Sequence, residues 1–389
     1  MTQPVRALDM APCHSPRSAP FMRIASISLV KDEADILEGF VRHNLHFVDR
    51  MYIIDDRSTD NTPEILRRLC AESDAVRVLE DGWTGAFHQA RRTTAAMRLI
   101  QKHEDWDIIL PLDADEMICA SDRAVFEEDL AAIPAGMAGA FAEMRYLAGP
   151  NDDMAIADPL TRVRQSLGYN PASVFKSLAP KALLKDATLA FDEGNHSLLS
   201  HGVRVPTHTL PRVPLAHFAI RSVDQIAVKC MKHYVGWRSR EDYTANFVPT
   251  LVAGAQALRD EPRFALSPSA AIIPAYCAGY ALEAAADRPF TERRGTLKWP
   301  ELAVSPPYAQ VIGLFDQLIA RAAAGDALVK AAGGDMSADA VARVIAERNA
   351  LQLEMDRLTA STSKLARAYW KAVGRRLFRS LRKRNLVKR

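Results

Sequence analysis

The feature that most constrains the fold is a regular alternation of short apolar runs with helix-like segments. The apolar runs cover residues 24–30, 51–54, 76–79 and 107–112. Segments with helical spacing of apolar residues lie between them, at 35–46, from 62 onward, and at 85–103. The first run is apolar on both faces, as a strand covered by helices is. The alternation predicts an α/β fold with an open, mostly parallel sheet and helices on both faces.

Two acidic clusters follow strands of this predicted sheet. Asp55 and Asp56 come directly after the second strand, and Asp113, Asp115 and Glu116 come after the fourth. Ligands of such sheets bind at the carboxyl ends of the strands. If the segment after the fourth strand is extended, Asp113 and Asp115 project to the same side and can converge on Mg²⁺ or Mn²⁺. The alternative is a solvated turn that caps a helix.

Composition restricts the class of protein. With 48% hydrophobic and 25% charged residues, the chain has the composition of a globular protein. No apolar stretch approaches the roughly 18 residues of a membrane-spanning helix. The five cysteines are too scattered for a zinc site or a redox dithiol. These observations exclude fibrous, wholly disordered and integral membrane proteins, and they indicate reduced structural thiols.

Four motifs occur in one order over about ninety residues, and together they resemble family 2 glycosyltransferases of the GT-A fold. The motifs lie at residues 28–33, 53–62, 89–92 and 110–116. The bacterial subgroup with a Lys-Asn/Asp-Glu start is the most similar. The resemblance covers residues 22–120 and extends more weakly to about residue 240. It implies transfer of a sugar from a nucleotide-sugar donor to an acceptor hydroxyl, normally with inversion.

The resemblance also implies roles for individual residues on the donor side. Lys31, Glu33 and either Asp55 or Asp56 would contact the base and ribose, and Arg91 would lie near the base or the diphosphate. Asp113 and Asp115 would coordinate Mn²⁺ or Mg²⁺, which bridges the donor phosphates. The donor is taken as a UDP-sugar by default, because no residue discriminates the base.

An inverting transfer needs a general base, usually a carboxylate. Asp192 and Glu193 are the candidates, with Glu193 preferred, although a surface turn would have the same sequence. His196 and His217 could supply a third metal ligand or a diphosphate contact, and a structural role is the alternative.

Farther along, a helix is expected from about residue 222 to 236. Arg221 could face phosphate. Lys229 and Lys232 are interpreted as residues that cover a helix face.

The predicted domain order is a disordered N-terminus at 1–20, a GT-A domain at 21–240, a helical appendage at 241–332 and a C-terminal region at 333–389. Residues 337–359 approximate a heptad seam that could form a homodimer. The last nineteen residues carry nine basic side chains and no acid, whereas the rest has 41 basic and 47 acidic residues.

This tail, residues 371–389, predicts a basic amphipathic helix on an anionic membrane surface, with a solubilising tail or nonspecific nucleic-acid affinity as alternatives. No specific nucleic acid is expected. The expected location is cytoplasmic, and possible peripheral binding would be to the inner face of the plasma membrane. The acceptor would be a carbohydrate or a lipid-linked molecule, in the synthesis of bacterial surface polysaccharide or glycolipid.

Two other classes compete with this interpretation. Haloacid-dehalogenase-type phosphatases also begin with Asp-x-Asp after an apolar strand, but they need Thr or Val where this chain has Met117. A catalytically silent scaffold would keep the fold and act through its C-terminal helix. Retention of both Asp113 and Asp115 argues against a silent scaffold.

Overall fold

The computed structural model describes residues 6–7, 22–83, 87–149, 152–238, 249–260, 273, 277, 285–291, 295–304 and 309–331. The chain forms two compact units. Met1–Phe247 and Gly279–Leu314 make up the first, and Val248–Ala278 and Phe315–Arg389 make up the second. The four motifs between residues 28 and 116 lie in the first unit. The linear domain boundaries predicted at residues 240 and 332 remain predictions.

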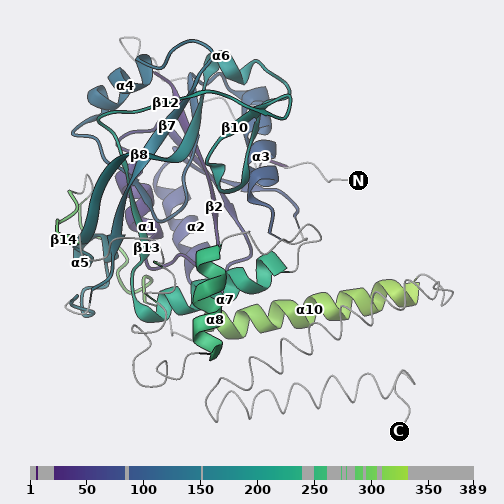
Figure 1. Cartoon of the computed structure of the whole chain (residues 1–389). Helices are drawn as coiled ribbons and strands as arrows, with labels where there is room; N and C mark the ends of the chain where they lie inside the picture. The colour runs from purple at the N-terminus through teal and green to yellow at the C-terminus, as the bar shows by residue number, and fades with distance from the viewer. Residues whose placement is uncertain are drawn as a thin grey trace, which may run out of the picture. The chain divides into compact units, whose positions relative to one another are not determined.

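The first half of the main sheet is parallel, as the alternation predicts, and Figure 1 marks its strand β2. Its strands are β2 (Ile24–Val30), β3 (Arg50–Asp55), β4 (Val76–Glu80) and β5 (Ile108–Pro111). They lie in the order β4-β3-β2-β5, and each neighbouring pair is parallel. The short β1 (Arg6–Ala7) pairs antiparallel with β4. The carboxyl ends of β3 and β5 therefore meet at one edge, and both acidic clusters follow there.

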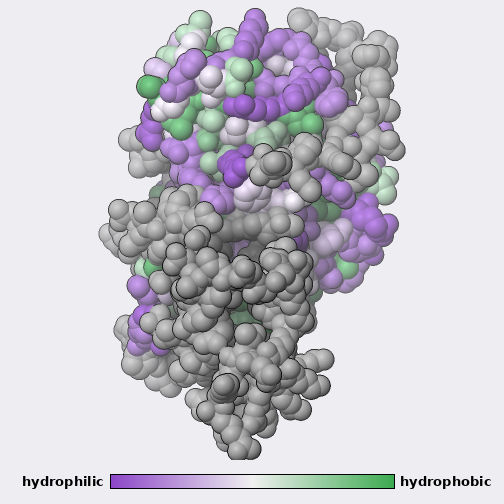
Figure 2. Space-filling view, turned by 90° about the vertical axis from the view of Figure 1, so that its right-hand side faces the viewer, coloured by the Kyte–Doolittle hydropathy of each residue, from purple (hydrophilic) through white to green (hydrophobic). Residues whose placement is uncertain are grey.

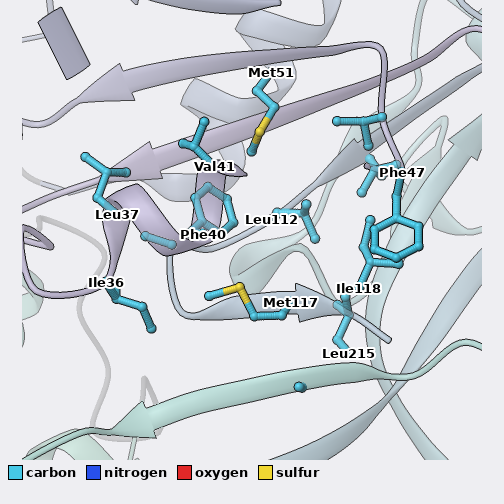
Figure 3. Close-up of a cluster of buried hydrophobic side chains, with 14 of the residues drawn as sticks. Ile36, Leu37, Phe40, Val41, Phe47, Met51, Leu112, Met117, Ile118 and Leu215 are labelled. Atoms are coloured by element: carbon cyan, nitrogen blue, oxygen red, sulfur yellow. The ribbon is translucent and has the colours of Figure 1, made fainter. Parts of the chain in front are cut away.

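Helices cover both faces of this half. On one face, α1 (Leu37–Asn44) and α2 (Thr62–Glu72) contribute to one buried hydrophobic cluster. On the other face, α3 (Gln89–His103) contributes to a second cluster. Figure 3 shows Leu37, Phe40 and Val41 of α1 between Met51 of β3 and Met117. The predicted α/β class is confirmed, with a parallel sheet in this half and helices on both of its faces.

The second half extends the sheet with mixed pairing. β8 (Gln165–Pro180) is antiparallel to both β5 and β7 (Ala138–Leu147). β13 (Leu215–Ile220) is parallel to β7 and antiparallel to β6 (Glu116–Ile118). Two edge strands, β12 (Thr207–Thr209) and β14 (Ala286–Asp287), pair with β7 and β8. Because β8 lies beside β5, its side chains reach the acidic cluster that follows β5.

Smaller elements complete the first unit. A separate three-stranded sheet contains β9 (Ala190–Phe191), β10 (Leu198–Ser200) and β11 (Val203–Arg204), with a 3-10 turn at Glu193–Asn195. The helices are α4 (Arg123–Ala131), α5 (Pro159–Arg162), α6 (Lys181–Leu184) and α7 (Val223–Arg238). The helix expected from about residue 222 is thus confirmed as α7.

The second unit contains α8 (Pro249–Asp260), and α10 (Ala309–Ala331) runs from the first unit into the second. Among the described helices, none combines the length and apolar character needed to cross a membrane. On the face drawn in Figure 2, the described surface is mostly hydrophilic with smaller hydrophobic patches. The predicted N-terminus at 1–20 apart from β1, the heptad seam at 337–359 and the basic tail at 371–389 lie outside the described residues.

Candidate active site

The acidic cluster after β5 forms a turn. The backbone N–H of Glu116 donates to the carbonyl of Asp113 (3.0 Å), and the N–H of Asp113 donates to Glu116 Oε2 (2.9 Å). The extended conformation that would project Asp113 and Asp115 to the same side is therefore wrong. The two carboxylates have different partners.

Asp113 is the more accessible of the two, with a side chain 33% exposed. Its Oδ1 accepts from Gln89 Nε2 (2.7 Å), at the start of α3, and its Oδ2 accepts from Lys176 Nζ (2.8 Å). Lys176 projects from β8 and is fully buried. Its ammonium also lies 2.9 Å from Glu116 Oε1 and donates to the carbonyl of Gly194 (3.1 Å).

For both Lys176 and Glu116, burial and the neighbouring charges shift the pKa in opposite directions. Burial alone would lower the pKa of Lys176, but the carboxylates of Asp113 and Glu116 raise it above its ordinary value. Burial raises the pKa of Glu116 to about 8 although the Lys176 ammonium lies beside it. Lys176 therefore stays charged at neutral pH, with its ammonium between Asp113 and Glu116.

Asp115 is buried among cations. Its Oδ2 accepts from Lys229 Nζ (2.5 Å), and Arg221 Nη1 lies 3.7 Å from the same oxygen. His217 Nε2 lies 3.6 Å from Asp115 Oδ1, and His217 Nδ1 contacts Glu143 Oε1 at 2.6 Å. Against the effect of burial, the positive charges on Lys229 and His217 hold the pKa of Asp115 well below its usual range.

The turn after β2 carries the first predicted donor residues. Lys31 Nζ donates to the carbonyl of Asp56 (2.7 Å). Asp32 has a left-handed backbone (φ 52°), and its carboxylate accepts from the N–H of Thr59 (2.6 Å) and from Lys232 Nζ (3.1 Å). The segments after β2 and β3 are thus bound to each other and to α7.

Glu33 does not face an open surface. Glu33 Oε2 accepts from Arg221 Nη2 (2.5 Å), and Arg221 Nε donates to Asp35 Oδ2 (2.7 Å). Arg221 is 1% exposed and lies against carboxylates, so the expectation that it faces phosphate is wrong. Because a buried guanidinium needs partners for its donors, Arg221 joins the end of β13 to the turn after β2.

Asp55 and Asp56 differ in environment. Asp55 is partly exposed and accepts from Ser58 Oγ (2.5 Å), whereas Asp56 is buried and accepts from Arg92 Nη1 (2.8 Å). The predicted Arg91 is exposed, and its guanidinium lies 5.1 Å from the ring centre of Trp83. Sequence reasoning missed Arg92, although its position on the buried stripe of α3 indicates a buried charge with a partner.

The candidate bases lie in the turn between β9 and β10. Asp192 Oδ1 accepts from the N–H of Glu193 (2.8 Å), and its Oδ2 accepts from Ser197 Oγ (3.1 Å). Gly194 has a left-handed backbone (φ 72°), and a Cβ there would lie 2.3 Å from His196 Nε2. The side chain of His196 is exposed, so the structure places it apart from the buried His217.

Sequence reasoning also missed the lysines of the site. Lys229 and Lys232 lie on the inner face of α7 and contact Asp115 and Asp32, so their interpretation as surface cover is wrong. The physical reason is that Asp32 and Asp115, on the turns that face α7, need counter-charges. Lys176 interrupts an apolar run of β8, which is the sequence signal of a buried ion pair.

The arrangement does not fit the predicted Mn²⁺ or Mg²⁺ site. Asp113 and Asp115 each bind a lysine ammonium, in different directions, and His217 is turned to Glu143 and Asp115. Within the described ranges, no group of three His, Cys, Asp or Glu side chains is placed to hold a metal ion. Metal ligation by Asp113, Asp115, His196 and His217 has no support in this geometry.

One comparison with known proteins covers the site. Residues 27–119, about a quarter of the chain, match the family described as "Glycosyl transferase family 2". This segment contains β2, β3, β5 and both acidic clusters, and the match supports a glycosyltransferase. The search of curated proteins returned no match.

Two solved structures are similar to parts of the chain. One, described as "Crystal Structure of a Mycobacterial Protein", is 16% identical with a TM-score of 0.27, and the alignment covers 44% of this chain and 58% of that one. The chain thus spans less than two thirds of that protein. The other is glucosyl-3-phosphoglycerate synthase from Mycobacterium tuberculosis in complex with phosphoglyceric acid, 14% identical with a TM-score of 0.26, covering 53% and 75%. Structural similarities this weak do not support a statement about function.

Proposed function

We propose that this chain, whose residues 27–119 match family 2 of the glycosyl transferases, moves a sugar from a nucleotide-sugar donor to an acceptor hydroxyl with inversion. The observation that carries the proposal is the position of the Lys176 ammonium. It contacts Asp113 Oδ2 at 2.8 Å and the carbonyl of Gly194 at 3.1 Å. One buried cation therefore joins the acid after β5 to the turn that holds the candidate bases.

On the donor side, we assign the base and ribose contact to Asp55. Asp56 is 4% exposed and is paired with Arg92, so its carboxylate is already used inside the protein. Asp55 is partly exposed, and Ser58 fixes its carboxylate. Lys31, which binds the carbonyl of Asp56, holds the same edge of the sheet together.

On the acceptor side, we assign the general base to Glu193. Asp192 accepts from the N–H of Glu193 and from Ser197 Oγ, so it stabilises the turn as a cap does. Glu193 is the next residue, and the Lys176 contact to Gly194 holds its turn beside Asp113. Asp192 is then a positioning residue.

The reaction is a displacement at the anomeric carbon. The acceptor oxygen forms a bond to this carbon while the bond from the carbon to the diphosphate oxygen breaks, and that electron pair leaves with the nucleoside diphosphate. The acceptor proton passes to the Glu193 carboxylate. Side chains that are positive before the reaction begins stabilise the charge of the leaving group without reorganisation. No step is assigned to a metal, since the carboxylates do not fit one as they are arranged.

The same proposal includes the bacterial Lys-Asn/Asp-Glu subgroup, the UDP-sugar donor, and a carbohydrate or lipid-linked acceptor in surface polysaccharide or glycolipid synthesis. It also includes membrane binding by residues 371–389 and dimerisation by residues 337–359.

The test is release of nucleoside diphosphate from UDP-, GDP- and dTDP-sugars, each with and without Mg²⁺ or Mn²⁺. We expect release from one donor, and a loss of at least about 10²-fold in Asp113→Asn and Glu193→Gln. The matched control is Asp74→Asn, whose carboxylate is 78% exposed and lies away from the site. If no donor is turned over or bound under any condition, the chain is a silent scaffold and the proposal is wrong.

A further inference from the structure

One face of α7 is lined with basic groups that point at the candidate site. Lys229, Lys232 and His233 are spaced at i, i+3 and i+4, which places them on the same side of a helix. Lys229 Nζ donates to Asp115, and Lys232 Nζ donates to Asp32 Oδ2 (3.1 Å). The ring of His233 contacts Phe87, and the histidine is close enough to both lysines for their charges to act on it.

A third lysine joins this face from the sheet. Lys31, at the carboxyl end of β2, donates from Nζ to the carbonyl of Asp56, and its own carbonyl accepts from Lys232 Nζ (3.2 Å). Lys31 and Lys232 are near enough to repel each other. We name Lys31, Lys229 and Lys232 the lysine cluster. It lies where β2 and β5 end, which is the edge at which sheets of this class bind their ligands.

The lysine cluster lies where a divalent cation would otherwise neutralise the negative charge of the donor phosphates. A metal bound by Asp115 would have to lie beside the Lys229 ammonium and the Arg221 guanidinium, both within 3.7 Å of Asp115 Oδ2. A metal bound by Asp113 would lie beside Lys176, 2.8 Å from Asp113 Oδ2. At these separations like charges repel strongly, even at the effective dielectric constant of a partly buried site.

We propose that the lysine cluster holds the donor diphosphate in place of a divalent metal, so that donor binding and sugar transfer need no divalent cation. This inference rests on the proposed function. An ammonium group has three N–H donors, so Lys229 can hold Asp115 and a phosphate oxygen together. The donors of Lys232 are used by Asp32, Gln310 and the carbonyl of Lys31, so Lys232 contributes its charge and holds Lys31 in the cluster. In this arrangement Asp32 and Asp115 position the cluster, and the charge that develops on the leaving diphosphate is compensated by Lys229 and its neighbours.

The experiment compares donor binding by calorimetry and nucleoside diphosphate release in EDTA and in Mg²⁺ or Mn²⁺. We expect the wild-type chain to bind and turn over its donor equally well, within about twofold, in both conditions. We expect Lys229→Met to lower kcat/KM by roughly 10² to 10³-fold, as removal of one charge-stabilising donor does. Lys229→Arg should retain part of this activity, because it keeps the charge.

The matched control is Lys102→Met, an exposed lysine in the last turn of α3 that should behave as wild type. Urea unfolding of each variant separates a lost contact from a lost fold, and Lys232→Met is the second variant if Lys229→Met does not fold. A direct Mn²⁺ titration of the donor-free protein, followed by electron paramagnetic resonance, should show no site that Asp113→Asn or Asp115→Asn removes.

The outcomes separate the two proposals. Donor binding or turnover that occurs only with a metal would leave the glycosyltransferase intact and overturn the metal-free inference. A Mn²⁺ site that depends on Asp113 or Asp115 would also overturn it. The absence of donor binding in every condition would overturn both proposals together.

Discussion

The guanidinium of Arg92 lies 2.8 Å from Asp56 Oδ1, and both side chains are buried. Arg92 Nε also donates to Asp81 Oδ2, at the end of β4. One arginine of α3 therefore binds the acids that follow two adjacent strands. The edge of the sheet on which the donor is proposed to lie is held together by this contact.

This contact predicts that replacing Arg92 costs much more stability than replacing the adjacent Arg91. Arg92→Met removes the guanidinium that joins the buried Asp56 to Asp81 and leaves Asp56 with the partly exposed Arg57. We expect the free energy of unfolding to fall by about 3–5 kcal/mol. Arg91→Met removes an exposed guanidinium over Trp83 and should cost no more than about 1 kcal/mol. Urea denaturation of the two variants measures both values. Equal losses would show that the Arg92 contacts do not stabilise the edge.

The parallel half of the fold could be predicted because each strand is an apolar run and each helix has a periodic apolar stripe. Residues 24–112 contain local signals for every element, and their order fixes the edge at which Asp55 and Asp113 lie. The mixed half could not be predicted in this way. β8 reaches β5 and β7 through pairings between residues far apart in sequence, and no local pattern encodes that register.

Around Asp113 and Asp115, the sequence predicted the acids but not most of the cations that bind them. Asp113 and Asp115 follow a strand and are visible in sequence, whereas their partners Lys176, Lys229 and Arg221 come from three distant elements. The sequence alone does not distinguish a charged residue on an exposed helix face from one in a buried ion pair. The metal prediction arose from this asymmetry, since the acids were visible and their counter-charges were not.

Lys176 should be indispensable to both stability and activity. Lys176→Met removes the ammonium that contacts both Asp113 and Glu116, and it frees the turn at Gly194. We expect a loss of about 3–5 kcal/mol in the free energy of unfolding. Lys181→Met, at an exposed lysine just after β8, is the matched control and should be near neutral. A Lys176 variant as stable as this control would contradict the assigned role.

The His217 and Glu143 pair predicts a window of pH stability. Burial opposes the charged form of His217, but Asp115 and Glu143 outweigh it and raise its pKa from 6.5 to about 9. The stability that charged His217 contributes is fully present below pH 6.5 and is lost as the pH rises through about 9. Burial likewise opposes the charge on Glu143, but His217 and Arg145 lower its pKa from 4.5 to about 2. That contribution is complete above pH 4.5 and is lost as the pH falls through about 2.

Both contributions are therefore complete between pH 4.5 and 6.5. Between pH 6.5 and 9, the stability of the wild-type chain should fall by up to about 1.4 kcal/mol per pH unit for the His217 proton. His217→Gln should reduce this slope, because glutamine does not titrate. The fall that remains below pH 8 would come from Glu116, whose pKa burial raises to about 8. Urea midpoints measured across the range for both proteins make the comparison. An unchanged slope in the variant would assign the dependence to another group.

The last prediction concerns the first two turns of α10, which contact the loop after β3. A Cβ on Gly313 would lie 2.4 Å from Thr59 Oγ1, and Gln310 bridges Lys232 and Asp60 one turn earlier. Gly313→Ala adds helix propensity worth about 1 kcal/mol, yet it forces Thr59 away from Asp32 at an overpacking cost of about 1–3 kcal/mol.

We therefore expect Gly313→Ala to destabilise the wild-type chain, and to stabilise a Thr59→Gly variant in which the clash is absent. Thermal unfolding of the wild-type chain, the two single variants and the double variant measures the four stabilities of this double-mutant cycle. A change of sign between the two backgrounds would demonstrate the clash with Thr59, because helix propensity alone would make Gly313→Ala stabilising in both. If it is stabilising in both, α10 does not rest on this loop. If the sign reverses as expected, the loop that holds Asp32 is held in place by a helix more than 250 residues away in sequence.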